Sequence, residues 1–332
     1  MRTKLIRIGI RLVGPIVLLL VLWKMGDPRT LWRLLASVSL VPLLFACALN
    51  APIIHFKVWR TQILCAIRGY RYGTRDAWRA MLPSLYLGMV TPGRVGDVLR
   101  VAYMREDLGA PRAEGLAIIV MDRFCDLYVL LGFVAAGIAH FAGVFVGRLG
   151  AITWLGVAAT ALLPLVFLVR GPADALSRAL RGRFIGPHDS AERFLAALRG
   201  QLQPKLAWAV PLTVASFLLN YVQGWLAARA MGLELGYADV IFMMAITSLL
   251  GLLPISMSGV GVRELFMALV FPTLGYGREQ GVAFGLLVFV VIYLSCSLAG
   301  LVAWQWSPPP IAAADDPGDK RLEDPKAKAI SE

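Results

Sequence analysis

Long apolar runs recur along the chain and alternate with short polar segments. About 20 consecutive apolar residues suffice for a helix to cross a bilayer. Runs of about this length lie at roughly 8–25, 34–56, 114–141, 151–169, 206–228 and 281–306. The pattern predicts an all-α polytopic membrane protein with about six full spans. It forms one integral membrane domain over 1–306, followed by a polar tail over 307–332 that we expect to be disordered and cytoplasmic.

Two further apolar stretches are interrupted by polar, glycine-containing sequence. The run at 80–90 is only about half a span and ends in Thr-Pro-Gly-Arg-Val-Gly-Asp at 91–97. The run that starts at Tyr237 is broken over 254–264 and returns at 265–274. Because Pro and Gly interrupt helices, each stretch predicts a re-entrant or broken helical hairpin. The backbone of these hairpins is expected to turn at Pro92, Gly93, Gly96, Pro254, Gly259 and Gly261.

Composition and charge narrow the class of protein and set its orientation. The chain is 58% hydrophobic and 16% charged, with a mean hydropathy of +0.69, which excludes a soluble enzyme or a nucleic-acid-binding protein. Of the 33 basic residues, 21 fall at 2–11, 57–112 or 170–205, and we therefore predict that these segments and both termini are cytoplasmic. The stretch 57–79 mixes basic and aromatic residues, which favours an interfacial helix.

Short motifs repeat in the same order in the two halves. Gly69 to Asp76 and Gly232 to Asp239 share the pattern G-x-x-x-G-x-x-D, 163 positions apart, and 112–117 resembles 278–283 at an offset of 166. Repeat one would cover about 34–141 and repeat two about 206–304, with the spans at 8–25 and 151–169 outside them. An odd number of spans separates the hairpins, so the repeats are predicted to be inverted. Secondary transporters often have this design, although gene duplication also produces scaffolds.

Charged residues near the hairpins and in the third span are the candidate substrate site. Those at the hairpin tips could bind an anion such as a lipid phosphate, or could pair with one another. Those of the third span could pair with Arg94 or Arg100, which we favour, or could couple to protons. The candidates are Arg94, Asp97, Arg100, Asp122, Arg123, Asp126, Arg263 and Glu264. Cysteines and histidines are isolated, so no metal, cofactor or catalytic residue is predicted.

Three segments resemble the lysylphosphatidylglycerol synthase transmembrane region, also described as a flippase-like family: Leu85 to Arg100, the motif Asp122-Arg123-x-x-Asp126, and Pro254 to Glu264 with its ending Gly-Val-Gly-Val-Arg-Glu. The resemblance extends to about Trp306. It implies movement of a lipid between leaflets. The family's aminoacyl-transferase chemistry belongs to a separate soluble domain, which this chain is expected to lack, and we therefore predict no enzymatic activity.

The leading hypothesis is a lipid translocase that moves an anionic or lipid-linked amphiphile across the bacterial inner membrane. The predicted partners are a membrane lipid and, as a possibility, enzymes of lipid biosynthesis; no nucleic acid is expected, and the oligomeric state is open. An accessory factor in envelope-lipid synthesis is the alternative. An intramembrane lipid transferase is less favoured, because the sequence has no D-x-D or HxxxxD motif.

Overall fold

A computed structural model describes residues 28–91, 96–141, 147–162, 165, 188–251 and 260–306. Every element within these ranges is a helix, which confirms the all-α prediction. The expected span at 8–25, the first half of the connection at 170–205 and the tail at 307–332 lie outside the described residues. So do five of the predicted tip residues: Pro92, Gly93, Arg94, Pro254 and Gly259.

The first half of the chain contains six described helices, and α8 follows them. They are α2 (Pro28–Ala36), α3 (Leu40–Ala48), α4 (Asn50–Ile67), α5 (Thr74–Val90), α6 (Leu99–Leu108), α7 (Arg112–His140) and α8 (Gly147–Leu162). Gly69 ends the α4 segment with a φ of 84°, and Gly109 ends α6 with a φ of 64°. Glycine adopts these left-handed angles without a steric penalty, so both turns follow directly from the sequence.

The second half begins with α11 (His188–Arg199), an amphipathic helix that packs against α7. The helices that follow are η2 (Pro204–Trp208), α12 (Ala209–Ala230), α13 (Tyr237–Leu250), α14 (Val262–Val270), η3 (Phe271–Leu274), α15 (Arg278–Val288), η4 (Phe289–Leu294) and α16 (Ser295–Trp306). The η4 segment is π-helical and joins α15 to α16. Gly232 and Gly275 turn the chain with φ angles of 71° and 82°.

Three of the described helical segments are long and apolar enough to cross a membrane: Leu40–Ile67, Pro204–Ala230 and Arg278–Trp306. The last two agree closely with the runs expected at 206–228 and 281–306. The 29-residue helix α7 matches the run at 114–141 and also has the necessary length, but it contains Asp122, Arg123 and Asp126. These helices confirm the prediction of a membrane protein with apolar helices.

The expected span at 34–56 was placed wrongly. Its helix starts at Leu40 and continues to Ile67, since Leu49 between α3 and α4 keeps right-handed angles (φ −63°, ψ −13°). The interfacial helix predicted over 57–79 was therefore also wrong: its first part is the end of α4, and its last part begins α5 at Thr74. Arg60 can lie inside the long helix because acidic side chains of α7 neutralise it.

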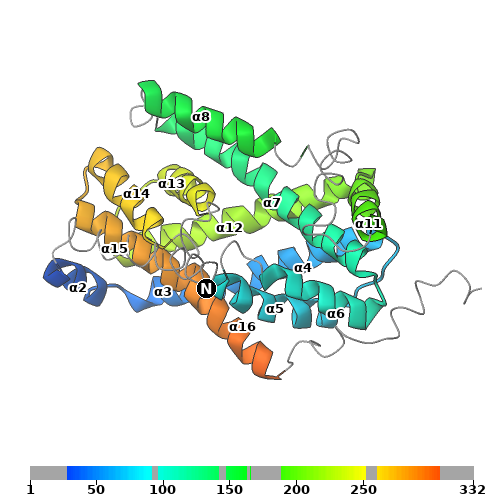
Figure 1. Cartoon of the computed structure of the whole chain (residues 1–332). Coiled ribbons are helices and arrows are strands. Elements are labelled where there is room, and N and C mark those ends of the chain that lie inside the picture. Colours follow the sequence, from blue (N-terminus) through cyan, green and yellow to red (C-terminus); the bar gives the residue numbers. More distant parts are fainter. Residues whose placement is uncertain are drawn as a thin grey trace, which may run out of the picture.

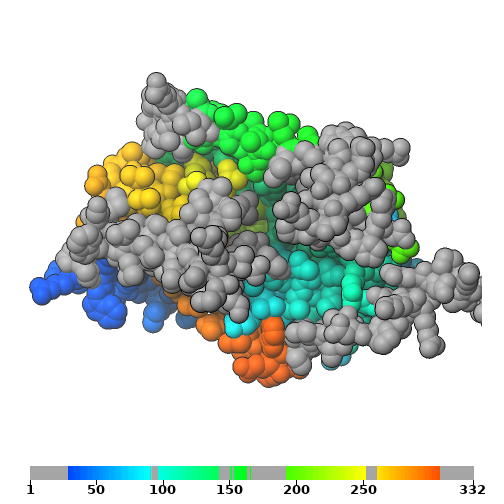
Figure 2. All heavy atoms as spheres, viewed as in Figure 1, coloured from blue at the N-terminus to red at the C-terminus, as the bar shows by residue number. Residues whose placement is uncertain are grey.

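The two halves pack through three helix pairs. Helix α4 lies against α12, α5 against α16, and α7 against α13. Contacts of Asn50 with Gln223 and of Arg60 with Thr213 show that α4 and α12 run antiparallel. Figure 1 shows α12 crossing the centre of the molecule, with α4, α5 and α6 toward its right end and α13, α14 and α15 toward its left end. In the space-filling view these two groups cover opposite ends of the visible face (Figure 2).

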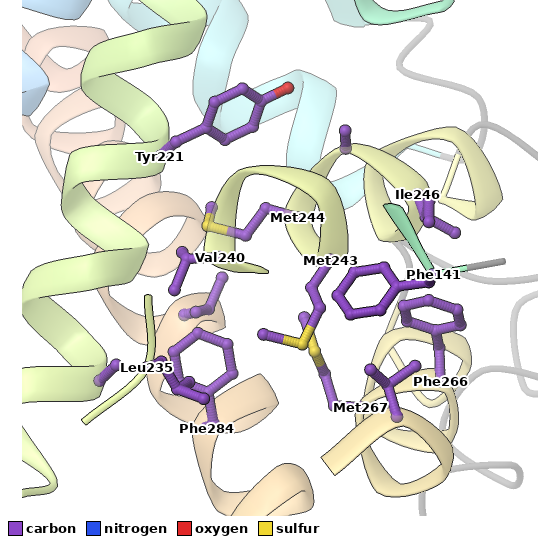
Figure 3. Packing of buried hydrophobic residues seen from close by; sticks show 14 of the residues in the cluster. Phe141, Tyr221, Leu235, Val240, Met243, Met244, Ile246, Phe266, Met267 and Phe284 are labelled. Atoms are coloured by element: carbon purple, nitrogen blue, oxygen red, sulfur yellow. The ribbon is translucent and has the colours of Figure 1, made fainter. Parts of the chain in front are cut away.

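Two large apolar clusters support this arrangement. One centres on α12, α13, α14 and α15, and the other on α4, α5, α6 and α7. In the first, Met243 and Met267 pack among the rings of Phe141, Phe266 and Phe284 (Figure 3). Flexible methionine side chains fill the irregular gaps between such rings. Phe141 follows α7, so this cluster also joins the two halves of the chain.

Candidate functional site

A network of buried ion pairs joins α4, α6 and α7. Arg60 donates from Nε to Asp122 Oδ1 at 2.6 Å and from Nη1 to Asp126 Oδ1 at 2.5 Å. Arg100 donates from Nη2 to the other oxygen of Asp122 at 2.9 Å. The side chains of Arg60, Arg100 and Asp122 are each 1% exposed. Burying ions is costly unless each charge has a partner, and this network supplies the partners.

Helical spacing explains why α7 can hold the network. Asp122 and Asp126 lie one turn apart and share a face, which allows the Arg60 guanidinium to reach both. Arg60 Nη1 also donates to Thr213 Oγ1 of α12 at 2.9 Å. The network therefore reaches α12, which belongs to the second half of the chain.

Arg123 is the arginine of this network that reaches solvent, because its side chain is 31% exposed. It approaches three carboxylates: Asp122 at 2.8 Å, Asp126 at 3.1 Å and Asp97 at 3.5 Å. Asp122 and Asp126 are also bound by Arg60, so they would keep a counter-ion if Arg123 moved. Arg123 is thus the member of the network most readily available to a ligand.

Asp97 lies just before α6 and is 8% exposed. Its Oδ2 atom has no hydrogen-bond partner. Gly96 positions it, because Gly96 packs so closely on α5 that a Cβ atom there would lie 2.3 Å from the backbone nitrogen of Gly88. The Gly96 N–H donates to Thr91 Oγ1 at 2.9 Å. Only glycine fits at position 96 without displacing the backbone of α5.

A cavity of about 100 Å³ lies beside Asp97 and Arg123, between the two halves of the chain. The first half contributes α4, α5 and α7 to its wall, and the second contributes α12, η4 and α16. Its polar lining consists of Asn50, Lys57, Asp97, Arg123, Asn220, Tyr293 and Cys296. The remaining lining is apolar, with Ile53, Ile54, Met81, Leu85, Gly88, Met89 and Ile292. An amphiphile with a small charged group matches such a surface.

The π-helical turn η4 forms one side of this cavity. Such turns leave backbone carbonyls without their usual helical donors, and they occur often at functional sites. Here the Asn50 side chain donates to the Val291 carbonyl at 3.0 Å and to Ser295 Oγ at 2.7 Å, and accepts from Gln223 at 2.9 Å. The Asn50 amide thus satisfies a carbonyl group of the irregular turn. Asn220 donates to Gln223 at 3.2 Å.

Arg263 and Glu264 form a separate buried pair at the start of α14. Glu264 accepts from Arg263 Nη2 at 2.7 Å and from the Gly261 N–H at 2.6 Å. Gly261 has a φ of 88°, a left-handed angle that glycine adopts without a steric penalty. The Arg263 guanidinium packs 5.4 Å from the ring centres of Phe289 and Tyr293. Arg263 therefore contacts the cavity wall through Tyr293.

The structure brings together Asp97, Arg100, Asp122, Arg123 and Asp126, five of the predicted site residues. The pairing of Asp122 with Arg100 that the sequence favoured is confirmed. Within the described part of the chain, no three His, Cys, Asp or Glu side chains are arranged to hold a metal ion.

Sequence reasoning missed Arg60 and Lys57. Both were assigned to the interfacial stretch because aromatic and basic residues follow them. The available signal was the apolar pattern on both sides of Arg60, at Ile53, Ile54 and Ile63-Leu64. This pattern places the charge inside a long helix, where it requires an acidic partner.

Comparison with known proteins identifies the family of the chain. Residues 8–300 match the family model described as the lysylphosphatidylglycerol synthase TM region. The chain belongs to this family. It is also 21% identical over 265 residues to a UPF0104 membrane protein of Methanocaldococcus jannaschii, a match that covers 74% of this chain and 78% of the archaeal protein. The family model covers the complete ion-pair network and both interrupted apolar stretches.

Proposed function

We propose that the chain is a lipid translocase that moves an anionic or lipid-linked amphiphile across the bacterial inner membrane, with both termini in the cytoplasm. The observation that carries this proposal is the cavity between the two halves, where Arg123 is accessible beside apolar walls. A phosphate would bind to the Arg123 guanidinium by charge-assisted hydrogen bonds. The apolar walls suit the adjoining hydrocarbon.

Symmetry between the halves supports a transport mechanism. The 163-residue offset relates Arg60 to Gln223 and Asn50 to Thr213. Arg60 contacts Thr213 and Gln223 contacts Asn50, so the offset converts one contact into the other. The same offset relates α5 to α13 and the end of α7 to α16, so the α5–α16 pair corresponds to the α13–α7 pair. A two-fold axis between the antiparallel helices α4 and α12 would produce these matches. They favour an inverted repeat with six spans and two hairpins.

The turns of the proposed repeats agree in detail. Gly69 and Gly232, 163 positions apart, have φ angles of 84° and 71°. The residues just before the next helices, Gly73 and Gly236, have nearly equal backbone angles, φ −63° and ψ 144° against φ −64° and ψ 146°. In an inverted repeat, an exchange of conformations between the halves opens a central site to each side of the membrane in turn. The proposed lipid group would be carried in this way.

A leaflet-specific assay in proteoliposomes tests the proposal. A fluorescent anionic phospholipid is placed in both leaflets, and a membrane-impermeant quencher then reports how fast the inner pool becomes accessible. Wild-type protein should accelerate this exchange, and Arg123→Gln should lower the protein-dependent rate at least about tenfold, equivalent to about 1.4 kcal/mol. The matched control is Arg229→Gln, which changes an exposed arginine outside the cavity lining.

Two outcomes would contradict the proposal. If wild-type protein does not accelerate exchange of any anionic or lipid-linked amphiphile tested, the accessory role in envelope-lipid synthesis becomes the better hypothesis. If Arg123→Gln and Arg229→Gln exchange the lipid equally fast, the cavity is not the transport site.

A further inference from the structure

The long helix at the end of the second half is irregular where it passes the cavity. Helices α15 and α16 are joined through the π-helical turn η4 into one helical segment of 29 residues, Arg278–Trp306 (Figure 1). The matching helix of the first half, α7, also has 29 residues but is α-helical throughout. The turn contributes Ile292 and Tyr293 to the cavity lining, and Cys296 of α16 lines the cavity just beyond it. The irregular turn therefore forms part of the cavity wall.

Side chains occupy the carbonyl group that a regular helix would use at this point. The Ser295 N–H bonds to the Val290 carbonyl, five residues back, whereas an α-helix would direct it to the Val291 carbonyl, four residues back. The Val291 carbonyl instead accepts from the Asn50 side-chain amide at 3.0 Å and from the Ser295 hydroxyl. A carbonyl oxygen has two lone pairs, so these two donors leave no place for a third. Asn50 therefore holds the turn in its π-helical form.

The two halves hold their matching helices by different kinds of bond. In the first half, Arg60 of α4 holds α7 by buried ion pairs with Asp122 and Asp126. Its counterpart at the 163-residue offset, Gln223 of α12, donates to the Asn50 side-chain oxygen at 2.9 Å, and Asn50 in turn holds η4. Exchanging a neutral hydrogen bond costs less than breaking a buried ion pair. The contact with η4 can therefore be exchanged more easily than the contact with α7.

Asn50 also lines the cavity, so a ligand can compete for its amide group. Its neighbour in the lining, Asn220, donates to the Gln223 side-chain oxygen at 3.2 Å and has no bond to η4. The Asn50 amide nitrogen donates to the Val291 carbonyl and to the Ser295 hydroxyl, so both of its N–H groups are in use. A polar ligand that accepts from Asn50 has to displace one of these bonds. Loss of the Val291 bond frees a lone pair for the Ser295 N–H and allows the α-helical bond to form.

We infer that η4 is a movable turn, which Asn50 holds in place and which is released when a ligand takes the Asn50 amide. This inference rests on the proposed function, because a carrier needs its central site to change shape with occupancy. On release the π turn shifts toward α16, while both ends of the long helix keep their packing. Successive helical residues are about 100° apart, so Cys296, which the turn passes, rotates by about this angle away from the cavity. A change in one local contact thereby alters the cavity wall.

Thiol labelling of Cys296 tests the position of the turn. The parent protein is the full chain with its three other cysteines replaced by alanine, and the rate of reaction with N-ethylmaleimide in detergent is followed by mass spectrometry. Asn50→Leu cannot donate to Val291, so the turn should shift and labelling should become at least about tenfold slower than in the parent. The matched control is Gln62→Leu, which removes another amide of α4, one that donates to the Tyr72 carbonyl and lies outside the cavity lining. It should leave the rate unchanged.

Deletion of Val290 distinguishes a movable turn from a purely structural role of Asn50. Val290 is an exposed residue of η4, and its removal allows a regular α-helix in which α16 keeps its orientation. Without the extra residue there is no turn to shift, so Asn50→Leu combined with the deletion should label Cys296 at about the rate of the parent. The deletion alone should lower the protein-dependent rate of lipid exchange in proteoliposomes at least about tenfold.

The outcomes separate this inference from the proposed function. Equal labelling of Cys296 in Asn50→Leu and in the parent would overturn the inference and leave the translocase proposal intact. Slow labelling that persists when the Val290 deletion is added would also overturn it, because Asn50 would then only support local packing. Undiminished lipid exchange by the deletion variant would overturn it as well. The expected labelling pattern, without any lipid exchange by wild type, would contradict the translocase proposal and support the movable turn.

Discussion

Arg60 and Arg123 contact the same two aspartates but are suited to different roles. Arg60 is almost fully buried and bridges α4, α7 and α12. Arg123 is partly exposed, and its partners Asp122 and Asp126 also form ion pairs with Arg60. Arg60 therefore stabilises the fold, whereas Arg123 can exchange a carboxylate for a ligand.

Loss of Arg60 should destabilise the protein strongly. Arg60→Met leaves the paired carboxylates with fewer counter-ions in a buried site, and breaking such a pair costs about 3–5 kcal/mol. Thermal unfolding in detergent should show a markedly lower Tm than for wild type, while Arg229→Gln should be close to wild type. A Tm for Arg60→Met within a degree of wild type would contradict the proposed structural role.

At the scale of the helices, glycine decides how closely α5 and α16 approach each other. Gly300 of α16 is buried, and a Cβ atom there would lie 2.4 Å from the Leu82 carbonyl oxygen and 3.0 Å from Tyr86 Cβ. Small residues permit such contacts between helices in membranes. In contrast, a Cβ atom at Gly132 of α7 would meet no other atom within 4 Å.

These two glycines form a matched pair for substitution. Gly300→Ala should force α5 and α16 apart and cost about 1–3 kcal/mol. Gly132→Ala should be neutral or stabilising by up to about 1 kcal/mol, since alanine favours the helix and nothing obstructs its side chain. Unfolding midpoints of the two variants should therefore move in different directions from wild type. Equal loss of stability in both would show that close packing at Gly300 is unimportant.

The sequence predicted features that depend on neighbouring residues, but not contacts between residues far apart in the chain. The boundaries of α7 and α12 follow from local hydrophobicity and were predicted within a few residues. The Asp122, Arg123 and Asp126 group was identified because charges in an apolar run are conspicuous. Arg60 was missed because its partners are 62 and 66 positions away. A pattern read along one helix cannot reveal neutralisation by another.

At the scale of the whole molecule, α7 and α13 form a second contact between the two halves. This contact lies near the end of α7, away from the ion-pair network. His140 Nε2 lies 2.7 Å from Asp239 Oδ1, and a Cβ atom at Gly137 would lie 3.0 Å from Phe242 Cβ. If the halves exchange conformations during transport, this contact has to change. A covalent link between α7 and α13 would prevent that change.

A disulfide between Gly137→Cys and Phe242→Cys should therefore stop lipid exchange reversibly. The two Cβ atoms are close enough for a bond after a small adjustment. The variant is made after replacement of Cys47, Cys65, Cys125 and Cys296, the free cysteines of the described chain. Oxidation should reduce the protein-dependent rate in proteoliposomes at least about tenfold, and a reductant should restore it. Each single-cysteine variant should be unaffected by oxidation; full activity of the cross-linked protein would exclude movement between α7 and α13.

The position of Arg60 also has a consequence for how the protein is made. Asp122 is synthesised 62 residues after Arg60, which at 5–20 residues per second takes about 3–12 seconds. During this interval α4 contains a charge without its acidic partner, and moving such a charge into lipid is energetically costly. We therefore expect insertion of α4 into the membrane to be completed only after α7 has left the ribosome. In that case the ion pairs that stabilise the finished protein also set the order of its assembly.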